Sequence, residues 1–225
     1  MEMDKFHCEF CKKDFIREQT LVKHLCEPKR RYNDKDKKGN RIGFSAFAQF
    51  YQKHSKKKKE LQDFIKSSYY SAFVKFGNYC VEAQVINIPR YIDWLLESNI
   101  SIDKWNKDTN YTKFLISYLK TEDPLDAIAR SIETCVMLAE QDNIQTKDVL
   151  KYSNRNKICF MITKGKISPW MLYQSKTGML FLEDLDTTQQ KMIYDYINPE
   201  QWAIKFTKSK TIITEIKELL HVGGY

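Results

Sequence analysis

The stretch that decides how the N-terminal end of the chain folds is residues 6–26, FHCEFCKKDFIREQTLVKHLC. Cys8 and Cys11 are separated by two residues, and His24 and Cys26 follow at the far end of the stretch. Thiolate and imidazole groups at such spacings are typical ligands of a tetrahedral metal ion. A segment of about 20 residues cannot bury enough apolar surface to fold alone, so we expect metal binding to supply its folding free energy.

Up to His24, this spacing resembles the two-Cys/two-His zinc finger. The resemblance implies a ββα unit that holds one Zn²⁺, with Phe15 and Leu21 forming a small core and His24 reaching the ion from the helix. The family's second histidine, three to five residues after the first, is absent here.

Cys26 is the nearest candidate for the fourth ligand. Two residues along a helix correspond to a rotation of about 200°, so His24 and Cys26 cannot both face the ion from a regular helix. We therefore expect the helix to unwind at Leu25. Pro28 supports this expectation, because it disfavours helical geometry at Glu27.

Two other histidines compete for the fourth position. His54 is the reserve candidate, and His7 is a poor one because its neighbour Cys8 already occupies that direction. The predicted ligands of one Zn²⁺ are Cys8, Cys11, His24 and Cys26.

The helix of the finger also carries candidate base contacts. In the DNA-binding form of this family, helix positions −1, 3 and 6 face the bases, and these are Arg17, Thr20 and Lys23, with Gln19 between them. Arg and Lys suit the O6 and N7 atoms of guanine. One finger covers only about 3 bp, so useful affinity needs further contacts.

The charge of the chain is concentrated next to the finger. Residues 1–60 hold 17 Lys and Arg and 9 Asp and Glu, whereas residues 61–225 hold 20 of each. The candidate phosphate contacts in this segment are Lys29, Arg30, Arg31, Lys56, Lys57, Lys58 and Lys59. Such an asymmetry favours a polyanion as partner. The alternative is a lysine-rich end that is merely solvated.

From residue 43 onward, the pattern is mainly helical. Apolar residues recur at helical spacing in residues 44–51, 61–80, 111–119 and 125–139, and the second of these predicts a single helix of about five turns. Predicted helix starts stand at Asn87, Ser101, Asp123, Ser168, Asp186 and Asn198, with Ser101 expected to cap a short turn up to Trp105. The last helix, around residues 212–220, is expected to stop at Gly223.

A minor β-hairpin is predicted near residues 156–184. Ile158, Phe160 and Ile162 alternate with polar residues, and a turn leads to the apolar run at 179–182. The expected domains are a zinc finger (1–27), a basic linker (28–42) and a mainly helical domain (43–225) with a possible subdivision near residue 153.

The remaining cysteines and the absence of long apolar runs indicate the compartment. Cys80, Cys135 and Cys159 lie among apolar residues and are expected to be small buried hydrophobes. No run of about 18 apolar residues is present, and the N-terminus lacks a signal-peptide pattern. We expect no membrane contact and an intracellular, reducing compartment: the cytoplasm of a host cell, or the nucleus in a eukaryote.

Enzyme signatures are missing from the sequence. The seven glycines fit neither a P-loop nor a dinucleotide-binding fingerprint. Glu183, Asp184 and Asp186 could bind a divalent metal for nuclease chemistry, but such a cluster is more often the acidic cap of a following helix.

The leading hypothesis is a non-enzymatic, zinc-dependent DNA-binding protein whose helical body docks a protein partner. RNA stays open as the nucleic acid. The alternative is a protein-interaction module or viral structural component in which the finger is a structural plug, and a nuclease is third. The finger followed by a basic arm and a helical body resembles uncharacterised zinc-finger proteins of large tailed bacteriophages, a resemblance that implies no activity.

Overall fold

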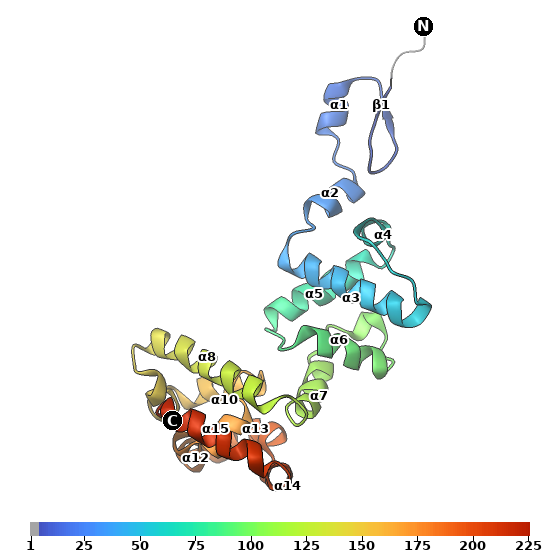
Figure 1. The fold of residues 1–225 in the computed structure, drawn as a ribbon. Helices are drawn as coiled ribbons and strands as arrows, with labels where there is room; N and C mark the ends of the chain where they lie inside the picture. The colour runs from blue at the N-terminus through green and yellow to red at the C-terminus, as the bar shows by residue number, and fades with distance from the viewer. Residues whose placement is uncertain (1–4) are drawn as a thin grey trace. The chain divides into compact units, whose positions relative to one another are not determined.

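The computed structural model describes residues 5–225 and divides the chain into two compact units, unit 1 (Met1–Lys107) and unit 2 (Asp108–Tyr225). Both units are helical, and the β structure of the described residues is one two-stranded antiparallel sheet in unit 1 (Figure 1). The expected fold class, mainly α with a small ββα finger, is confirmed. The boundary between the units follows Lys107 and does not lie near residue 153.

Unit 1 begins with the hairpin and continues through six α-helices and a short 3₁₀ helix. Its elements are β1 (Phe6–His7), β2 (Asp14–Phe15), α1 (Glu18–Lys23), α2 (Glu27–Asn33), α3 (Lys38–Ser55), α4 (Leu61–Lys66), α5 (Tyr70–Glu82), α6 (Ile88–Glu97) and η1 (Ile102–Lys104). Residues 28–42, expected to be a linker, are mostly helical. The reason is packing, because Gly39 and Asn40 at the start of α3 are buried against the rest of the unit.

The helices α3 and α5 lie side by side in Figure 1 and approach at their backbones. A Cβ atom on Gly77 of α5 would lie 1.9 Å from the carbonyl oxygen of Gly39 on α3, and one on Gly43 would lie 2.7 Å from that of Phe73. Side chains would therefore force the two helices apart. An aromatic core that includes Phe73 and Trp105 surrounds this contact.

The single helix predicted for residues 61–80 is wrong, because the chain breaks it into α4 and α5. Ser67 is extended, with φ −66° and ψ 138°. The guanidinium of Arg31 on α2 donates to the carbonyl oxygens of Ile65 and Ser67 at 2.8 and 3.2 Å and lies over the ring of Tyr70. A distant side chain thus satisfies carbonyl groups at the end of α4.

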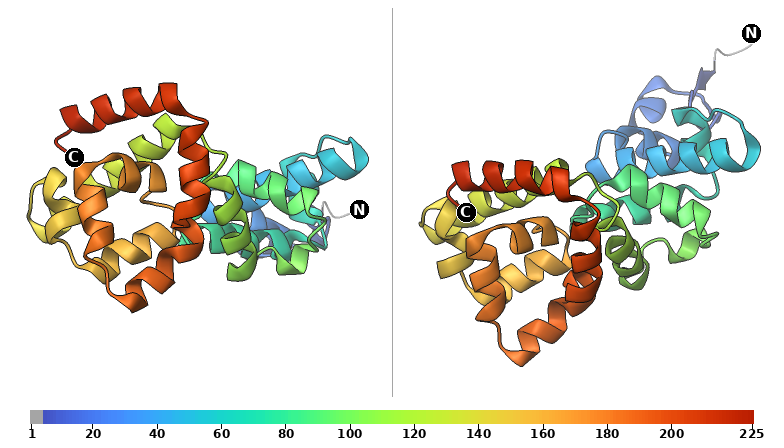
Figure 2. Two further views of the ribbon diagram at one scale, coloured as in Figure 1. Left: turned by 90° about the horizontal axis from the view of Figure 1, so that it is seen from below. Right: turned by 60° about the horizontal axis from the view of Figure 1, so that its bottom comes forward.

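Unit 2 consists of helices connected by short turns. Its elements are α7 (Asp108–Tyr118), α8 (Pro124–Asp142), η2 (Thr146–Asp148), α9 (Val149–Tyr152), α10 (Arg155–Thr163), α11 (Pro169–Gln174), α12 (Lys176–Glu183), α13 (Thr187–Ile197), α14 (Pro199–Thr207) and α15 (Lys210–Val222). Figure 2 shows α15 running beside α8. Trp170 and Trp202, which are fully buried, pack edge to face in the core.

The predicted hairpin near residues 156–184 is also wrong, because α10, α11 and α12 occupy this segment. In α10, Ile158, Cys159 and Ile162 are buried, whereas Phe160 is 48% exposed. The buried positions follow the helical i, i+1, i+4 pattern and not the alternation of a strand. Ser175, expected in a turn, instead caps α12 by accepting a hydrogen bond from the N–H of Gly178.

The sequence predicted the ends of helices best where a nearby side chain caps them. Five of the six predicted N-cap side chains accept a backbone N–H: Asn87, Asp123, Ser168, Asp186 and Asn198. Ser101 stands at the predicted position before η1, but its side chain makes no capping bond and donates to the carboxylate of Asp103. The last helix ends as expected, with Gly223 as its C-cap. None of the described helices has the length and apolar character that a membrane span needs.

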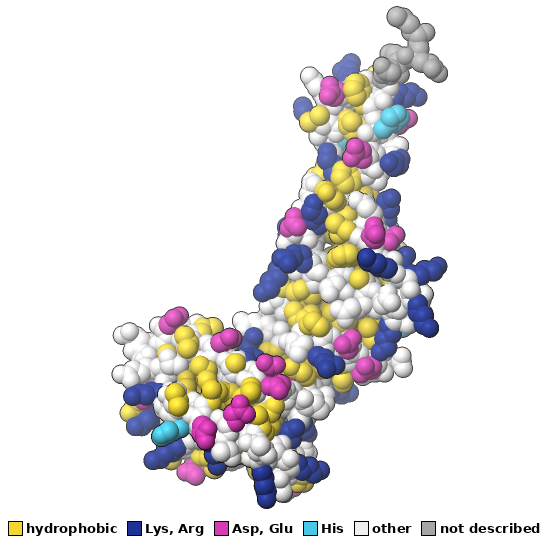
Figure 3. All heavy atoms as spheres, viewed as in Figure 1, with side chains coloured by type: hydrophobic (Ala, Val, Ile, Leu, Met, Phe, Trp, Pro, Cys, Tyr) yellow, Lys and Arg dark blue, Asp and Glu magenta, His cyan; other side chains and the backbone are white. Residues whose placement is uncertain are grey.

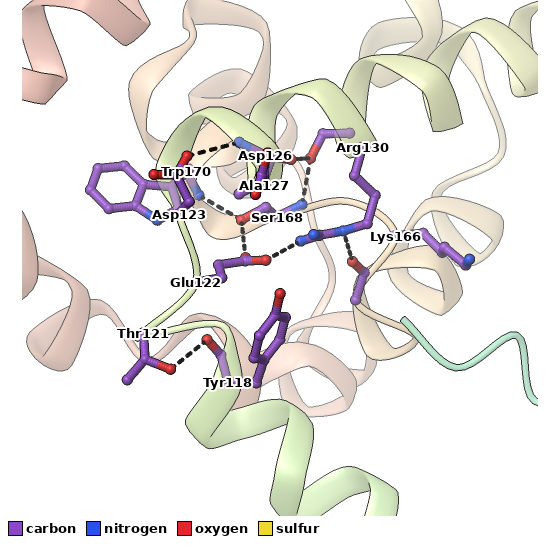
Figure 4. Close-up of polar contacts among 12 residues, drawn as sticks. Tyr118, Thr121, Glu122, Asp123, Asp126, Ala127, Arg130, Lys166, Ser168 and Trp170 are labelled. Atoms are coloured by element: carbon purple, nitrogen blue, oxygen red, sulfur yellow. Dashed lines mark hydrogen bonds and ion pairs between the residues drawn. The ribbon is translucent and has the colours of Figure 1, made fainter. Parts of the chain in front are cut away.

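A buried polar cluster joins three segments of unit 2 (Figure 4). The carboxylate of Glu122, which follows α7, lies 2.7 Å from the guanidinium of Arg130 on α8 and accepts a hydrogen bond from the hydroxyl of Ser168 before α11. Arg130 also donates to the carbonyl oxygen of Gly165 at 2.7 Å. The side chain of Glu122 is fully buried, and burial raises its pKa from 4.5 to about 7, against the lowering effect of Arg130.

Candidate metal centre

The hairpin positions the first two candidate ligands. Strands β1 and β2 pair Phe6 with Phe15, and the backbone turns back so that the N–H of Cys8 donates to the carbonyl oxygen of Lys13 at 2.9 Å. Lys12 takes the left-handed conformation, with φ 61°, and closes the turn by donating to the carbonyl oxygen of Cys8. This tight turn brings the thiols of the first two cysteines to the same side.

The second pair of ligands comes from an extended segment. Helix α1 ends at Lys23, and both His24 (φ −70°, ψ 118°) and Cys26 (φ −76°, ψ 163°) have extended backbones. Side chains two residues apart on an extended chain point to the same side, so both can reach one ion. The expected unwinding is confirmed, but it begins one residue before Leu25, and His24 follows the helix and is not part of it.

The four ligand atoms form one cluster. The Sγ atoms of Cys8, Cys11 and Cys26 and a ring nitrogen of His24 all lie within 4.8 Å of one another. The Sγ atoms of Cys8 and Cys26 are 3.8 Å apart, close to the separation of about 3.8 Å that two thiolates take around a tetrahedral Zn²⁺. It is far too long for a disulfide, whose S–S bond is about 2.05 Å. The sulfur of Cys11 lies 3.2 Å from Nε2 of His24.

The electrostatics of the cluster favour a metal-binding thiolate. The backbone N–H of Cys11 is the main cause that lowers the pKa of the Cys8 thiol to about 7. Burial raises the pKa of the Cys26 thiol, which a bound cation would offset. Three thiolates and one imidazole form a soft donor set that fits a thiophilic ion, and four protein ligands leave no open position for a reacting water.

The segment around the cluster has almost no core of its own. Among the described residues of the finger, 5–26, Cys8 is the single buried one, with 3% of its surface exposed. Phe15 packs against the imidazole of His24 with ring centres 4.7 Å apart, and Phe10 contacts Tyr32 of α2. Such limited apolar burial cannot hold the ligands together without an ion.

The other histidines lie outside this cluster. His54 stands on α3, where its Nδ1 contacts the carbonyl oxygen of Phe50, and His7 pairs with Asp14 across the hairpin. Among the described residues, Cys8, Cys11, His24 and Cys26 are the one group that could hold a metal ion. The acidic cluster before α13 is used otherwise: Asp184 pairs with Arg155, and Asp186 caps the helix.

The predicted nucleic-acid contacts are distributed over unit 1. Those on α1 and at its start are all exposed, and so are Arg30 and most of the lysine run, which forms the loop between α3 and α4. Dark-blue Lys and Arg side chains gather over this loop in Figure 3. Arg31 differs from the others because its guanidinium donates to the carbonyl oxygens of Ile65 and Ser67 and forms an ion pair with Glu27.

The other cysteines are buried, as expected for side chains with a packing role. Cys80, Cys135 and Cys159 are at most 2% exposed, and burial raises the pKa of each thiol to about 11 or 12. Sequence reasoning missed the structural role of Arg31, because a long-range contact from a basic run leaves no local signal.

No protein-family model, curated protein or solved structure matches this chain.

Proposed function

We propose that the chain is a non-enzymatic, zinc-dependent DNA-binding protein. Its finger and basic N-terminal arm contact the phosphates and bases of duplex DNA, while unit 2 docks a protein partner. One observation carries this proposal: unit 1 contains the metal-ligand cluster together with 22 Lys and Arg and 14 Asp and Glu, whereas unit 2 has 15 of each. A net charge of +8 confined to the unit that contains the metal-ligand cluster suits a polyanionic partner.

The exposed surface of α1 supports base contact by the finger. Arg17 is the N-cap and Glu18 the first helical residue, so Arg17, Thr20 and Lys23 hold the positions −1, 3 and 6 at which such helices meet bases in the major groove. All three are exposed, and Arg17 and Lys23 have no ion-pair partner among the described residues.

The phosphate contacts are assigned to Lys29, Arg30 and the loop Lys56–Lys59. Arg31 is left out, because its guanidinium is engaged within unit 1. Unit 2 supports partner docking through an apolar groove of about 330 Å³ that includes Tyr173 and Tyr194.

The test is the salt dependence of binding to a labelled DNA duplex. Each neutralised phosphate contributes about 0.9 to the slope of log K against log salt, so replacing Lys56–Lys59 by glutamine should reduce that slope by about 3 to 4. The matched control replaces four exposed lysines of unit 2: Lys191, Lys208, Lys210 and Lys217. Duplex affinity that is independent of salt, or that survives metal removal and the unit 1 substitutions unchanged, would refute the proposal.

A protein-interaction module is the second candidate, and one observation favours it. Three aliphatic side chains of the finger are widely exposed: Ile16 and Val22 at 70% and Leu25 at 61%. Exposed apolar groups on so small a unit are typical of a contact surface. Under this function, Val22→Ser should abolish a stoichiometric complex that resists nuclease treatment, while the lysine substitutions should leave that complex intact.

A further inference from the structure

A cavity of about 570 Å³ opens in unit 1 between the end of α3, the start of α5 and the segment that joins α6 to η1. This volume lies within the range of small-molecule sites. The metal centre and the base-facing side of α1 contribute nothing to its lining. It is therefore a separate candidate binding site.

Aromatic rings line one side of this cavity. The imidazole of His54 stacks on Phe50, with ring centres 4.3 Å apart and an interplanar angle of 26°. Phe50 also packs edge to face against Phe73 and Trp105 of the core. Tyr69, at the entrance to α5, keeps 53% of its surface exposed. A flat ring system entering the cavity would meet rings already fixed by the core.

Three polar residues also line this cavity. Asn99, Ser101 and Asp103 belong to the cavity wall, and the hydroxyl of Ser101 is hydrogen-bonded to the carboxylate of Asp103. Carboxylate and amide groups are suited to the hydrogen-bonding edges of nucleobases, whose amino groups are donors. The lining of the cavity therefore offers both stacking and hydrogen bonds.

The basic loop begins at the rim of the cavity. Lys56, the C-cap of α3, follows His54 by two residues, and Lys57 and Lys58 are exposed. The ammonium group of Lys59 lies 5.1 Å from the ring centre of Tyr51, which itself lines the cavity. The loop Lys56–Lys59 thus starts next to this ring-lined cavity, with Lys59 beside one of its rings, and such an arrangement complements a base and its flanking phosphates.

We propose that this cavity takes an unpaired base of single-stranded nucleic acid, with Lys56–Lys59 holding the adjacent phosphates. The inference rests on the proposed function in taking nucleic acid as the partner and in using the same Lys56–Lys59 loop for phosphate contacts. A single strand is required because the face of a base in a duplex is covered by its stacked neighbours. A finger on the duplex and this cavity on an adjoining single strand would together recognise a junction.

The experiment measures fluorescence anisotropy of the full-length, metal-loaded protein with a labelled 12-nucleotide DNA strand and with the matching duplex. Loss of one stacking contact corresponds to a factor of about 5 to 150 in affinity. Tyr69→Ala and His54→Ala should each weaken single-strand binding by such a factor and leave duplex binding unchanged. Tyr69→Phe should keep full affinity, because the ring is retained.

Two controls separate stacking from charge and from misfolding. Tyr152→Ala removes an equally exposed tyrosine beside a lysine in neutral unit 2, and it should have no effect. A strand with abasic sites at its centre keeps its phosphates, so it should bind the native protein more weakly by the same factor and should not distinguish the native protein from Tyr69→Ala.

The two proposals can fail separately. Single-strand binding that is unaffected by Tyr69→Ala and by His54→Ala, or an abasic strand that binds as tightly as the intact one, would overturn the base site while leaving duplex binding by the finger untouched. Loss of duplex binding with the base site intact would overturn only the proposed function.

Discussion

Two kinds of local backbone meet at the candidate metal centre, and the second kind places the fourth candidate ligand. A tight turn supplies Cys8 and Cys11, whereas the extended stretch after α1 supplies His24 and Cys26. The pattern of the first three ligands could be predicted from their spacing alone. The fourth depended on where the helix ends, which the sequence placed to within one residue.

The assignment of Cys26 predicts a difference between two variants. Cys26→Ala should lower Zn²⁺ affinity by more than about 100-fold, as Cys8→Ser should, because each removes a thiolate from the donor set. His54→Ala should leave affinity unchanged, since His54 lies on α3 and outside the cluster. Competition with a chromophoric chelator measures all three. Full affinity in Cys26→Ala would show that another group is the fourth ligand.

The buried carboxyl of Glu122 predicts a pH dependence of stability. Its pKa in the folded protein is raised from 4.5 to about 7, so between these values the folded state binds more protons than the unfolded state. The stability that the protonated group contributes is complete below about pH 4.5 and is lost as pH rises through about 7. The total effect is about 3 kcal/mol.

Comparison with Glu122→Gln isolates this contribution, because the other titrating groups are common to both proteins. The measurement is urea unfolding followed by tryptophan fluorescence. As pH rises from 5 to 8, we expect the free energy of unfolding of the variant to increase relative to that of the native protein. The absence of any trend over this range would mean that attraction to Arg130 outweighs burial and that the carboxylate is charged throughout.

At the scale of helices and strands, the sequence was most informative where a boundary is set by nearby atoms. Asp123 and Asp186 cap their helices by accepting hydrogen bonds from N–H groups two or three residues away, so the local sequence alone located these helix starts. At the break between α4 and α5, the free carbonyl groups are bound by Arg31, which lies more than 30 residues earlier. The spacing of apolar residues within 61–80 gives no information on such a contact. The false hairpin arose because Phe160 is an exposed aromatic residue on a helix.

The contact between α3 and α5 is the second feature that periodicity missed, and it predicts a strong effect of one methyl group. Gly77→Ala would place a Cβ atom 1.9 Å from a backbone oxygen of Gly39, which cannot move without separating the helices. We expect a loss of about 3 kcal/mol in the stability of unit 1. Ser45→Ala, on the exposed side of α3, is the control. Thermal unfolding followed by circular dichroism should show no change for the control, and an unaltered midpoint for Gly77→Ala would contradict the close packing.

At the scale of the whole molecule, charge and core are divided between the two units. Unit 1 carries the full net charge of +8, and unit 2 is neutral. The sequence predicted the charge asymmetry, because it needs only counting. It did not predict the division after Lys107, since each unit's core joins side chains distant in sequence, such as Phe73 with Trp105 in one and Trp170 with Trp202 in the other.

This division predicts that residues 108–225 fold as an independent fragment. Its core contains Trp170, Trp202 and Phe206, and the buried contacts of Glu122 with Arg130 and Ser168 join three of its segments without any group from unit 1. The fragment should therefore unfold cooperatively, with a near-ultraviolet circular dichroism signal from its packed tryptophans. Being neutral, it should bind neither duplex nor single-stranded DNA at 150 mM salt (about physiological). A fragment that melts without cooperativity would show that its core needs unit 1, and one that binds DNA as tightly as the whole chain would place the nucleic-acid surface in the neutral half.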